Sequence, residues 1–204
     1  GLGDDVTVGF TLGGSATAGL DYQPLAMPVT IPAGAASVTL SVQPLADTFA
    51  EGPETVTVTA VPGAHYHLRL AEQSATVTIE DLPLDGWRFE KFGDAANDPA
   101  VAGDSADPDR DGQDNMREYI AGTEPLDAAS FFKATAERAP GGPFTVRFTA
   151  QPDHSYSVFY KNSLSATTWR KLTDIAAESA AREVGVSDPG AVAQRFYRVV
   201  TPAQ

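Results

Sequence analysis

The sequence contains no cysteine, which excludes disulfide bonds and thiolate zinc sites. It also lacks a run of about 18 apolar residues, so no segment is expected to span a membrane. Its 14 basic residues are outnumbered by 27 acidic ones, and the net charge of −13 disfavours nucleic acid and favours divalent cations. No signal peptide is recognisable, and we expect the 204 residues to be a processed chain or a piece of a longer protein.

Signatures of catalytic sites are missing too. The chain has no G-x-S-x-G elbow, no phosphate-binding glycine loop and no H-E-x-x-H motif. His65 and His67 would project from one face of a strand, yet no acid at ligand spacing completes a zinc site. A glycosidase needs a pair of carboxylates, but the acids here cluster as calcium ligands do. We therefore expect a protein that is not an enzyme.

The most informative segment runs from Asp107 to Glu118 and has the sequence DPDRDGQDNMRE. A calcium ion takes six to eight oxygens, and a twelve-residue loop supplies them from alternating positions around a sharp central turn. Positions 1, 3, 5, 7, 9 and 12 are Asp107, Asp109, Asp111, Gln113 through its carbonyl, Asn115 and Glu118. Gly112 permits the turn. The alternative, a solvated acidic turn, would have to match the motif at six defined positions by chance.

The surroundings indicate a single EF-hand-like loop. Downstream, residues 115–121 have the spacing of a short helix ended by Gly122, whereas the upstream residues are rich in helix breakers. Position 8 is Asp114 and not the aliphatic residue that bridges paired loops, so a second loop is not expected. With the sequence EYIAGTEP that follows, residues 104–127 resemble the thrombospondin type 3-like and dockerin-like calcium segments of bacterial proteins.

Charge divides the chain into three parts. Residues 1–82 carry nine acids and one base, residues 83–131 twelve acids and four bases, and residues 132–204 six acids and nine bases. We predict an all-β protein in which two β-sandwich domains, 1–82 and 132–204, are joined by an irregular calcium-binding connector with one short helix.

Period-two alternation predicts the strands of the first domain. They lie at Val6–Leu12, Val38–Val42, Val56–Val58 and Ala75–Ile79. Four segments in this order, GSATAGLDY, VTIPAG, DTFAEGPET and ATVTIED, resemble those of a Calx-beta domain. The resemblance implies a second, weaker calcium site at one end of the sandwich. Its candidate ligands are Asp21, Asp47, Glu51, Glu54, Glu80 and Asp81.

The alternative for these acids is that they cap turns, above all Glu54, which enters a strand directly. Only five residues precede Val6, whereas such a sandwich ordinarily begins with an earlier strand. The edge at Val6–Leu12 is therefore expected to be either truncated or open for a strand from another chain.

The connector begins with an aromatic run in which Trp87, Phe89 and Phe92 are expected to dock on a neighbouring segment. A sugar-binding role for Trp87 is the alternative. The last domain should hold strands at residues 144–148, 155–160, 169–172 and 195–200, with a helical turn or a loop at 177–184. It resembles a C-terminal β-module of secreted proteins from Verrucomicrobia-like bacteria. Trp169 and Tyr197 are expected to be packing residues.

Together these features predict a calcium-binding structural or adhesive module of a bacterial secreted or cell-surface protein, in which Ca²⁺ rigidifies the connector. Its partners would be calcium, neighbouring copies or other surface proteins, and polysaccharide. Two alternatives remain open. A carbohydrate-binding accessory region of a secreted hydrolase would expose aromatics near Trp87 or Tyr156 and Tyr160, and a filament subunit would receive a strand at the open edge.

Overall fold

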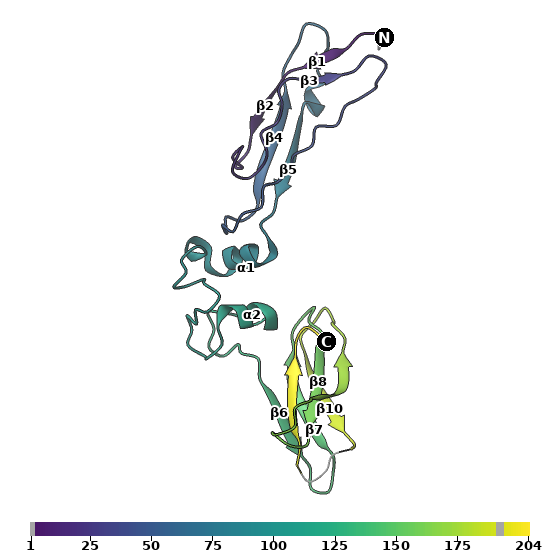
Figure 1. The fold of residues 1–204 in the computed structure, drawn as a ribbon. Helices are drawn as coiled ribbons and strands as arrows, with labels where there is room; N and C mark the ends of the chain where they lie inside the picture. The colour runs from purple at the N-terminus through teal and green to yellow at the C-terminus, as the bar shows by residue number, and fades with distance from the viewer. Residues whose placement is uncertain (1–2, 191–193) are drawn as a thin grey trace. The chain divides into compact units, whose positions relative to one another are not determined.

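The computed structural model describes residues 3–190 and 194–204, apart from the side chain of Leu70. The chain forms two compact units, Gly1–Asn97 and Asp98–Gln204, and the boundary falls inside the predicted connector. The described residues form antiparallel strands in four sheets and only two α-helices (Figure 1). The all-β class is therefore confirmed. Neither of the described helices is long and apolar enough to cross a membrane.

The first unit contains two small sheets. Its elements are β1 (Val6–Val8), β2 (Phe10–Gly13), β3 (Val29–Ile31), β4 (Glu54–Ala60), β5 (Ser74–Ile79) and α1 (Pro83–Phe92), with 3-10 turns at Leu70–Glu72 and Gly93–Ala95. Strand β1 pairs with β3, and a second sheet has the order β2-β4-β5. The alternation predicted for this sheet is present only in part. Val56 of β4 is fully buried, and the hydroxyls of Thr57 and Thr76 contact each other at 2.9 Å on the exposed face, but Ala75 and Val77 of β5 are exposed as well.

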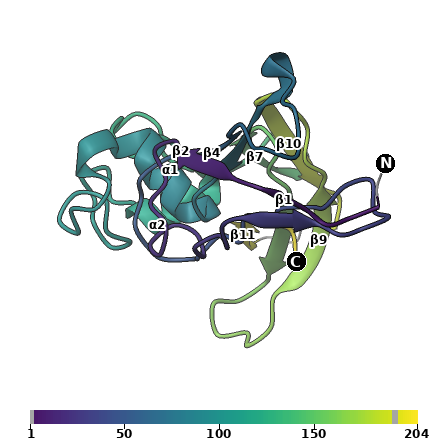
Figure 2. The ribbon, with the colours of Figure 1, turned by 90° about the horizontal axis from the view of Figure 1, so that it is seen from above.

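The second unit begins with the calcium-loop segment and α2 (Asn115–Ala121). Six strands follow: β6 (Ala134–Arg138), β7 (Phe144–Ala150), β8 (Tyr156–Lys161), β9 (Arg170–Ile175), β10 (Arg182–Asp188) and β11 (Phe196–Val200). They form two sheets, β10-β7-β6 and β11-β8-β9. Figure 2 shows the segment between β8 and β9 as a loop that projects from its sheet.

The core of the second unit is built by both sheets. Val146, Phe148 and Ala150 of β7 pack with Tyr156 and Val158 of β8, and all five are at most 3% exposed. The rings of Phe148 and Tyr156 are 5.1 Å apart. Tyr156 is fully buried, and its hydroxyl oxygen accepts the main-chain N–H of Gln151 at 2.8 Å. Aromatic burial of this kind fixes the two sheets against each other.

Some sequence predictions are wrong. Val38–Val42 forms no strand, because among the described residues only its flanks are held by main-chain bonds, Gln23 to Gln43 and Leu45 to Asp21. His65 and His67 lie in an irregular segment, not on a strand. Residues 182–188 belong to β10, so the predicted loop at 177–184 ends earlier.

The connector holds two helices instead of one. The aromatic run that includes Trp87 forms α1, which starts with Pro83 at its first turn and ends at Gly93 with φ 53°. Proline at a helix start and glycine just after a helix end are the positions that each residue favours. The mixed spacing of aromatic and charged residues in this segment gave no clear helical period, which is why the sequence pattern did not indicate α1.

Candidate metal centres

The loop from Asp107 to Glu118 holds three aspartates whose carboxylates lie together, with one oxygen of each within 4.8 Å of the others. One oxygen of every aspartate also accepts a main-chain N–H of the loop. Gly112 donates to Asp107 Oδ2 at 3.1 Å, Asp111 to Asp109 Oδ1 at 3.2 Å, and Gln113 to Asp111 Oδ1 at 2.7 Å. The backbone therefore sets the orientation of all three carboxylates.

The second oxygen of each aspartate is buried and has no hydrogen-bond partner among the described residues. Asn115 and Glu118 each contribute one more such atom, and the full set is Asp107 Oδ1, Asp109 Oδ2, Asp111 Oδ2, Asn115 Oδ1 and Glu118 Oε2. Burying an unpaired polar atom costs free energy, so such atoms are rare in folded proteins. Five within one loop, all of them oxygens, would supply most of the six to eight oxygens that a hard cation such as Ca²⁺ takes.

Asn115 shows how the loop orients a neutral ligand. Its side-chain nitrogen donates to the carbonyl oxygens of Val101 and Gly103, both at 2.8 Å, and the residue is 1% exposed. Because both amide hydrogens are engaged upstream of the loop, the amide oxygen is the atom left over. The residues that hold Asn115 lie outside the twelve-residue motif, so the motif alone gave no sign of them.

Glu118 occupies the last ligand position and is fully buried. Burial, with the charges of Asp109, Asp111 and Asp107 as further causes, raises the pKa of Glu118 to about 7. A 3.4 Å hydrogen bond from Thr123 Oγ1 to Glu118 Oε1 opposes this shift. Burial also raises the pKa of Asp109. Without a nearby positive charge, Glu118 is therefore protonated in about half of the molecules at neutral pH.

The backbone around the loop matches the predicted turn and helix. Gly112 has φ 98°, a conformation that side chains disfavour, and Arg110 is also left-handed with φ 64°. Asp114 caps α2 by accepting the N–H of Arg117 at 3.0 Å, and Gly122 ends the helix at φ 72°. The short helix thus begins inside the loop and carries Glu118 back toward the aspartates.

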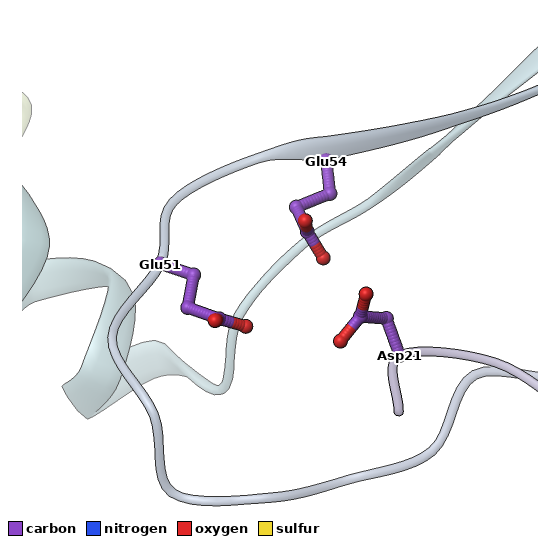
Figure 3. A group of neighbouring side chains, drawn as sticks. All are labelled: Asp21, Glu51 and Glu54. Carbon is purple, nitrogen blue, oxygen red and sulfur yellow. The ribbon is translucent and has the colours of Figure 1, made fainter. Parts of the chain in front are cut away.

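A second group of acids lies at one end of the first unit. Asp21, Glu51 and Glu54 bring one carboxylate oxygen each to within 4.8 Å of one another, and Figure 3 shows Asp21 facing Glu51 and Glu54, which lie on a single stretch of chain. They line a pocket of about 150 Å³ together with Asp47, Glu80 and Asp81. All six residues that the Calx-beta resemblance implied therefore line this pocket, and three of them, Asp21, Glu51 and Glu54, bring their carboxylate oxygens together.

The acids of the pocket differ in their contacts. Asp21 accepts the N–H of Thr17 at 2.5 Å and is 8% exposed, whereas Glu51 is exposed. Asp81 Oδ2 accepts the N–H groups of both Glu51 and Gly52, and thereby shapes the loop that presents Glu51. Among the described residues, no acid of this pocket leaves a buried oxygen without a partner.

Crowding of the carboxylates perturbs two glutamates. Burial raises the pKa of Glu51, and the charges of Asp21, Asp47 and Asp81 raise it further. Burial likewise raises the pKa of Glu54, with Asp21 as the next cause through both its charge and a hydrogen bond. Like charges held this close favour either protonation or a bound cation. Glu54 therefore belongs to the acidic cluster even though it also begins β4.

Helix α1 and the turn after it hold the loop that carries Glu51. The main chain of Ala50 makes two hydrogen bonds with the Asn97 side chain, both at 2.9 Å. The ring of Phe89 lies so close to Gly52 that a Cβ there would be 2.5 Å from it. Phe89 therefore docks within its own unit, as expected for the aromatic run. Asn97 had no sequence signal, since a lone asparagine two residues before a proline also suits a turn.

Comparisons with known proteins add little to these sites. No family model matches the chain, and no curated protein matches it. The crystal structure of the calcium binding domain CBD12 of CALX1.1 is similar, with a TM-score of 0.33 and 13% identity, over 91% of this chain and 63% of that chain. This chain thus spans less than two thirds of that one. The family resemblances remain predictions, and the two sites rest on their own geometry.

Proposed function

We propose that the chain is a calcium-binding module whose main site is the loop from Asp107 to Glu118. The observation that carries the proposal is the set of five buried oxygens without partners, contributed by five ligand positions of one loop. Gln113 would add its main-chain carbonyl. The acidic pocket of the first unit, with Asp21, Glu51 and Glu54 at its centre, would be a second and weaker site.

The role of the ion would be mechanical. Four carboxylates of the loop repel one another unless a cation neutralises them, so binding of the ion and ordering of the segment are thermodynamically linked. The segment also carries Gly122, on which the ring of His154 packs: a Cβ at Gly122 would lie 2.6 Å from His154 Cε1. Calcium would thus stiffen the segment where it joins the β-sandwich of the second unit.

An extracellular location is consistent with calcium binding, because the millimolar calcium outside cells saturates sites of modest affinity. We therefore keep the proposal of a structural or adhesive module in a bacterial secreted or cell-surface protein, without catalytic activity. Secretion of the natural precursor, followed by cell fractionation, would test the location. Assays of polysaccharide hydrolysis would test the absence of an enzyme.

Isothermal titration calorimetry with calcium tests the main site. The wild type should show a tight event and a looser one. Asp109→Asn with Glu118→Gln should remove the tight event, because the variant loses two of the four charges. Asp153→Asn with Glu137→Gln is the matched control, since it removes the same number of charges from exposed residues outside the loop. Unchanged binding in the loop variant would refute the proposal.

A filament assembled by strand addition remains a second candidate. Strands β2 and β5 are the edges of the sheet β2-β4-β5, and Val77 of β5 is 45% exposed. An unpaired edge is a template for another strand. Light scattering of this chain beside a version extended by its natural upstream residues would test the idea, and a monomer in both forms would exclude it.

A further inference from the structure

The outer face of the sheet β11-β8-β9 presents alternating cations and aromatic rings. The basic aromatic face consists of Phe159, Lys161, Trp169, Lys171 and Arg198. In the sheet register, Arg198 stands opposite Phe159, and Phe159 stands opposite Lys171, so the three residues form one row across three strands. The inner face of the same strands belongs to the core, where Tyr156 and Val158 are fully buried.

Each cation of this face lies over a ring. The guanidinium carbon of Arg198 is 5.0 Å from the centre of the Trp169 ring and 5.2 Å from that of Phe159. The ammonium of Lys161 is 4.8 Å from the Trp169 ring, and that of Lys171 is 5.9 Å from the Phe159 ring. Such contacts hold long basic side chains in place without neutralising their charge.

The cations of the face differ in how far they are neutralised. Lys171 pairs with Asp174 at 3.0 Å, and Lys161 donates only to the carbonyl oxygens of Leu164 and Ala166. Arg198 is exposed, and none of the described acids forms an ion pair with it. Lys161 and Arg198 therefore carry charge for which the described part of the chain provides no carboxylate.

The charges of Lys161 and Arg198 favour an anionic partner. The small number of cations on the face limits how densely charged that partner can be. DNA carries one charge per roughly 1.7 Å of its axis, and its binding needs many cations. This face offers only three, Lys161, Lys171 and Arg198. An acidic polysaccharide spreads its charges over whole sugar units, and it presents apolar C–H groups between them that can lie against Trp169 and Phe159.

We infer that the basic aromatic face binds an acidic polysaccharide, with Arg198 and Lys161 pairing with its carboxylate or sulfate groups beside Trp169. The sequence had suggested Tyr156 and Tyr160 as sugar-binding aromatics, but Tyr156 is buried in the core. The binding surface would lie on the opposite side of the same strand. This inference does not depend on calcium binding by the loop.

Biolayer interferometry at a fixed calcium concentration tests the inference, with hyaluronate as the carboxylated probe, dextran sulfate as the sulfated probe and dextran as the neutral one. The wild type should bind one or both acidic polymers and not dextran. Affinity should fall with added salt, because exposed charges are screened. Arg198→Gln with Lys161→Gln should weaken the affinity by about tenfold or more, since each lost contact is charge-assisted.

Arg147→Gln with Arg69→Gln is the matched control, because it removes the same charge from exposed side chains of another sheet and of the other unit. This variant should bind as the wild type does. Arg198→Lys should bind with intermediate strength, since it keeps the charge but loses the planar fork. If the control variant lost as much affinity as Arg198→Gln with Lys161→Gln, the net charge of the chain would explain the effect, and the inference would be wrong. Tighter binding of duplex DNA or polyglutamate, or no binding of either acidic polysaccharide, would also overturn it.

Discussion

The two acidic clusters of the chain differ in how their oxygens are held. The loop from Asp107 to Glu118 draws its ligands from twelve consecutive residues, and its free oxygens are buried. The pocket around Asp21 collects acids from three distant segments, and Glu51 within it is exposed. In the loop, like charges are confined without solvent, whereas in the pocket water can relieve part of the repulsion. Calcium should therefore matter more to the second unit than to the first.

The largest effect should follow removal of calcium. A ligand at a hundred times its Kd stabilises the folded state by about 2.7 kcal/mol. A chelator should therefore lower the melting temperature of the second unit much more than that of the first. Differential scanning calorimetry of the whole chain measures the melting temperatures of both units. The variant Asp109→Asn plus Glu118→Gln is the reference in which the loop should no longer bind calcium. Equal shifts in both units would break the comparison.

The pKa of Glu118 makes the loop sensitive to pH. Its folded value of about 7 exceeds the ordinary 4.5, so the folded, calcium-free protein binds more protons than the unfolded chain between these values. Calcium-free stability should then fall as pH rises from about 5 to about 8, by on the order of 2–3 kcal/mol. Calcium affinity should change in the opposite direction and rise with pH, because the ion displaces the proton.

Chemical denaturation at several pH values, with and without calcium, checks both signs. Glu118→Gln is the informative control, since it cannot titrate and should flatten the calcium-free profile. A calcium-free protein that gains stability with rising pH would show that Glu118 is ionised in the folded state.

A substitution at Asn115 can distinguish the effect of side-chain charge on calcium affinity from the effect of side-chain orientation. Asn115→Asp adds a negative charge, which by charge count alone should tighten calcium binding. It also removes both hydrogen bonds to Val101 and Gly103, which hold the side chain. We expect weaker binding and a loss of about 2 kcal/mol of calcium-free stability, because two half-buried carbonyls lose their donor. Calorimetric titration decides, and tighter binding by the variant would show that charge dominates.

The same contrast explains what could be predicted from the sequence. The convergence of oxygens from Asp107, Asp109, Asp111, Asn115 and Glu118 could be predicted from the sequence, because consecutive residues leave the backbone few ways to arrange them. The helix α2 followed from the spacing before Gly122. Asn97 and the partners of Asn115 were not predicted, since hydrogen bonds between distant segments depend on tertiary packing, which leaves no periodic signal. Val38–Val42 had the alternation of a strand but lacks a ladder partner among the described residues.

The pocket of the first unit should give a smaller effect. Asp21→Asn with Glu51→Gln removes two of its central charges, and the weaker calcium event should lose about tenfold or more in affinity, equivalent to about 1.4 kcal/mol. The tight event of the loop should stay unchanged, which serves as the internal control in the same titration. If the variant instead weakens the tight event, the assignment of the two events to the two clusters is wrong.

The smallest effect on calcium affinity is expected from the hydrogen bonds of Asn97, which support the loop beside the pocket. Asn97→Ala removes the two hydrogen bonds to Ala50 while leaving every carboxylate in place. We expect a loss of about 1–2 kcal/mol in the stability of the first unit, with a modest weakening of the looser calcium event, because the segment that presents Glu51 loses its anchor. Gln23→Ala, an exposed amide of the same unit, is the control for side-chain truncation. A variant that loses stability but keeps its affinity would show that the pocket holds its shape without Asn97, and that the remaining contacts, the bonds of Asp81 to Glu51 and Gly52 and the packing of Phe89 on Gly52, suffice to position the loop.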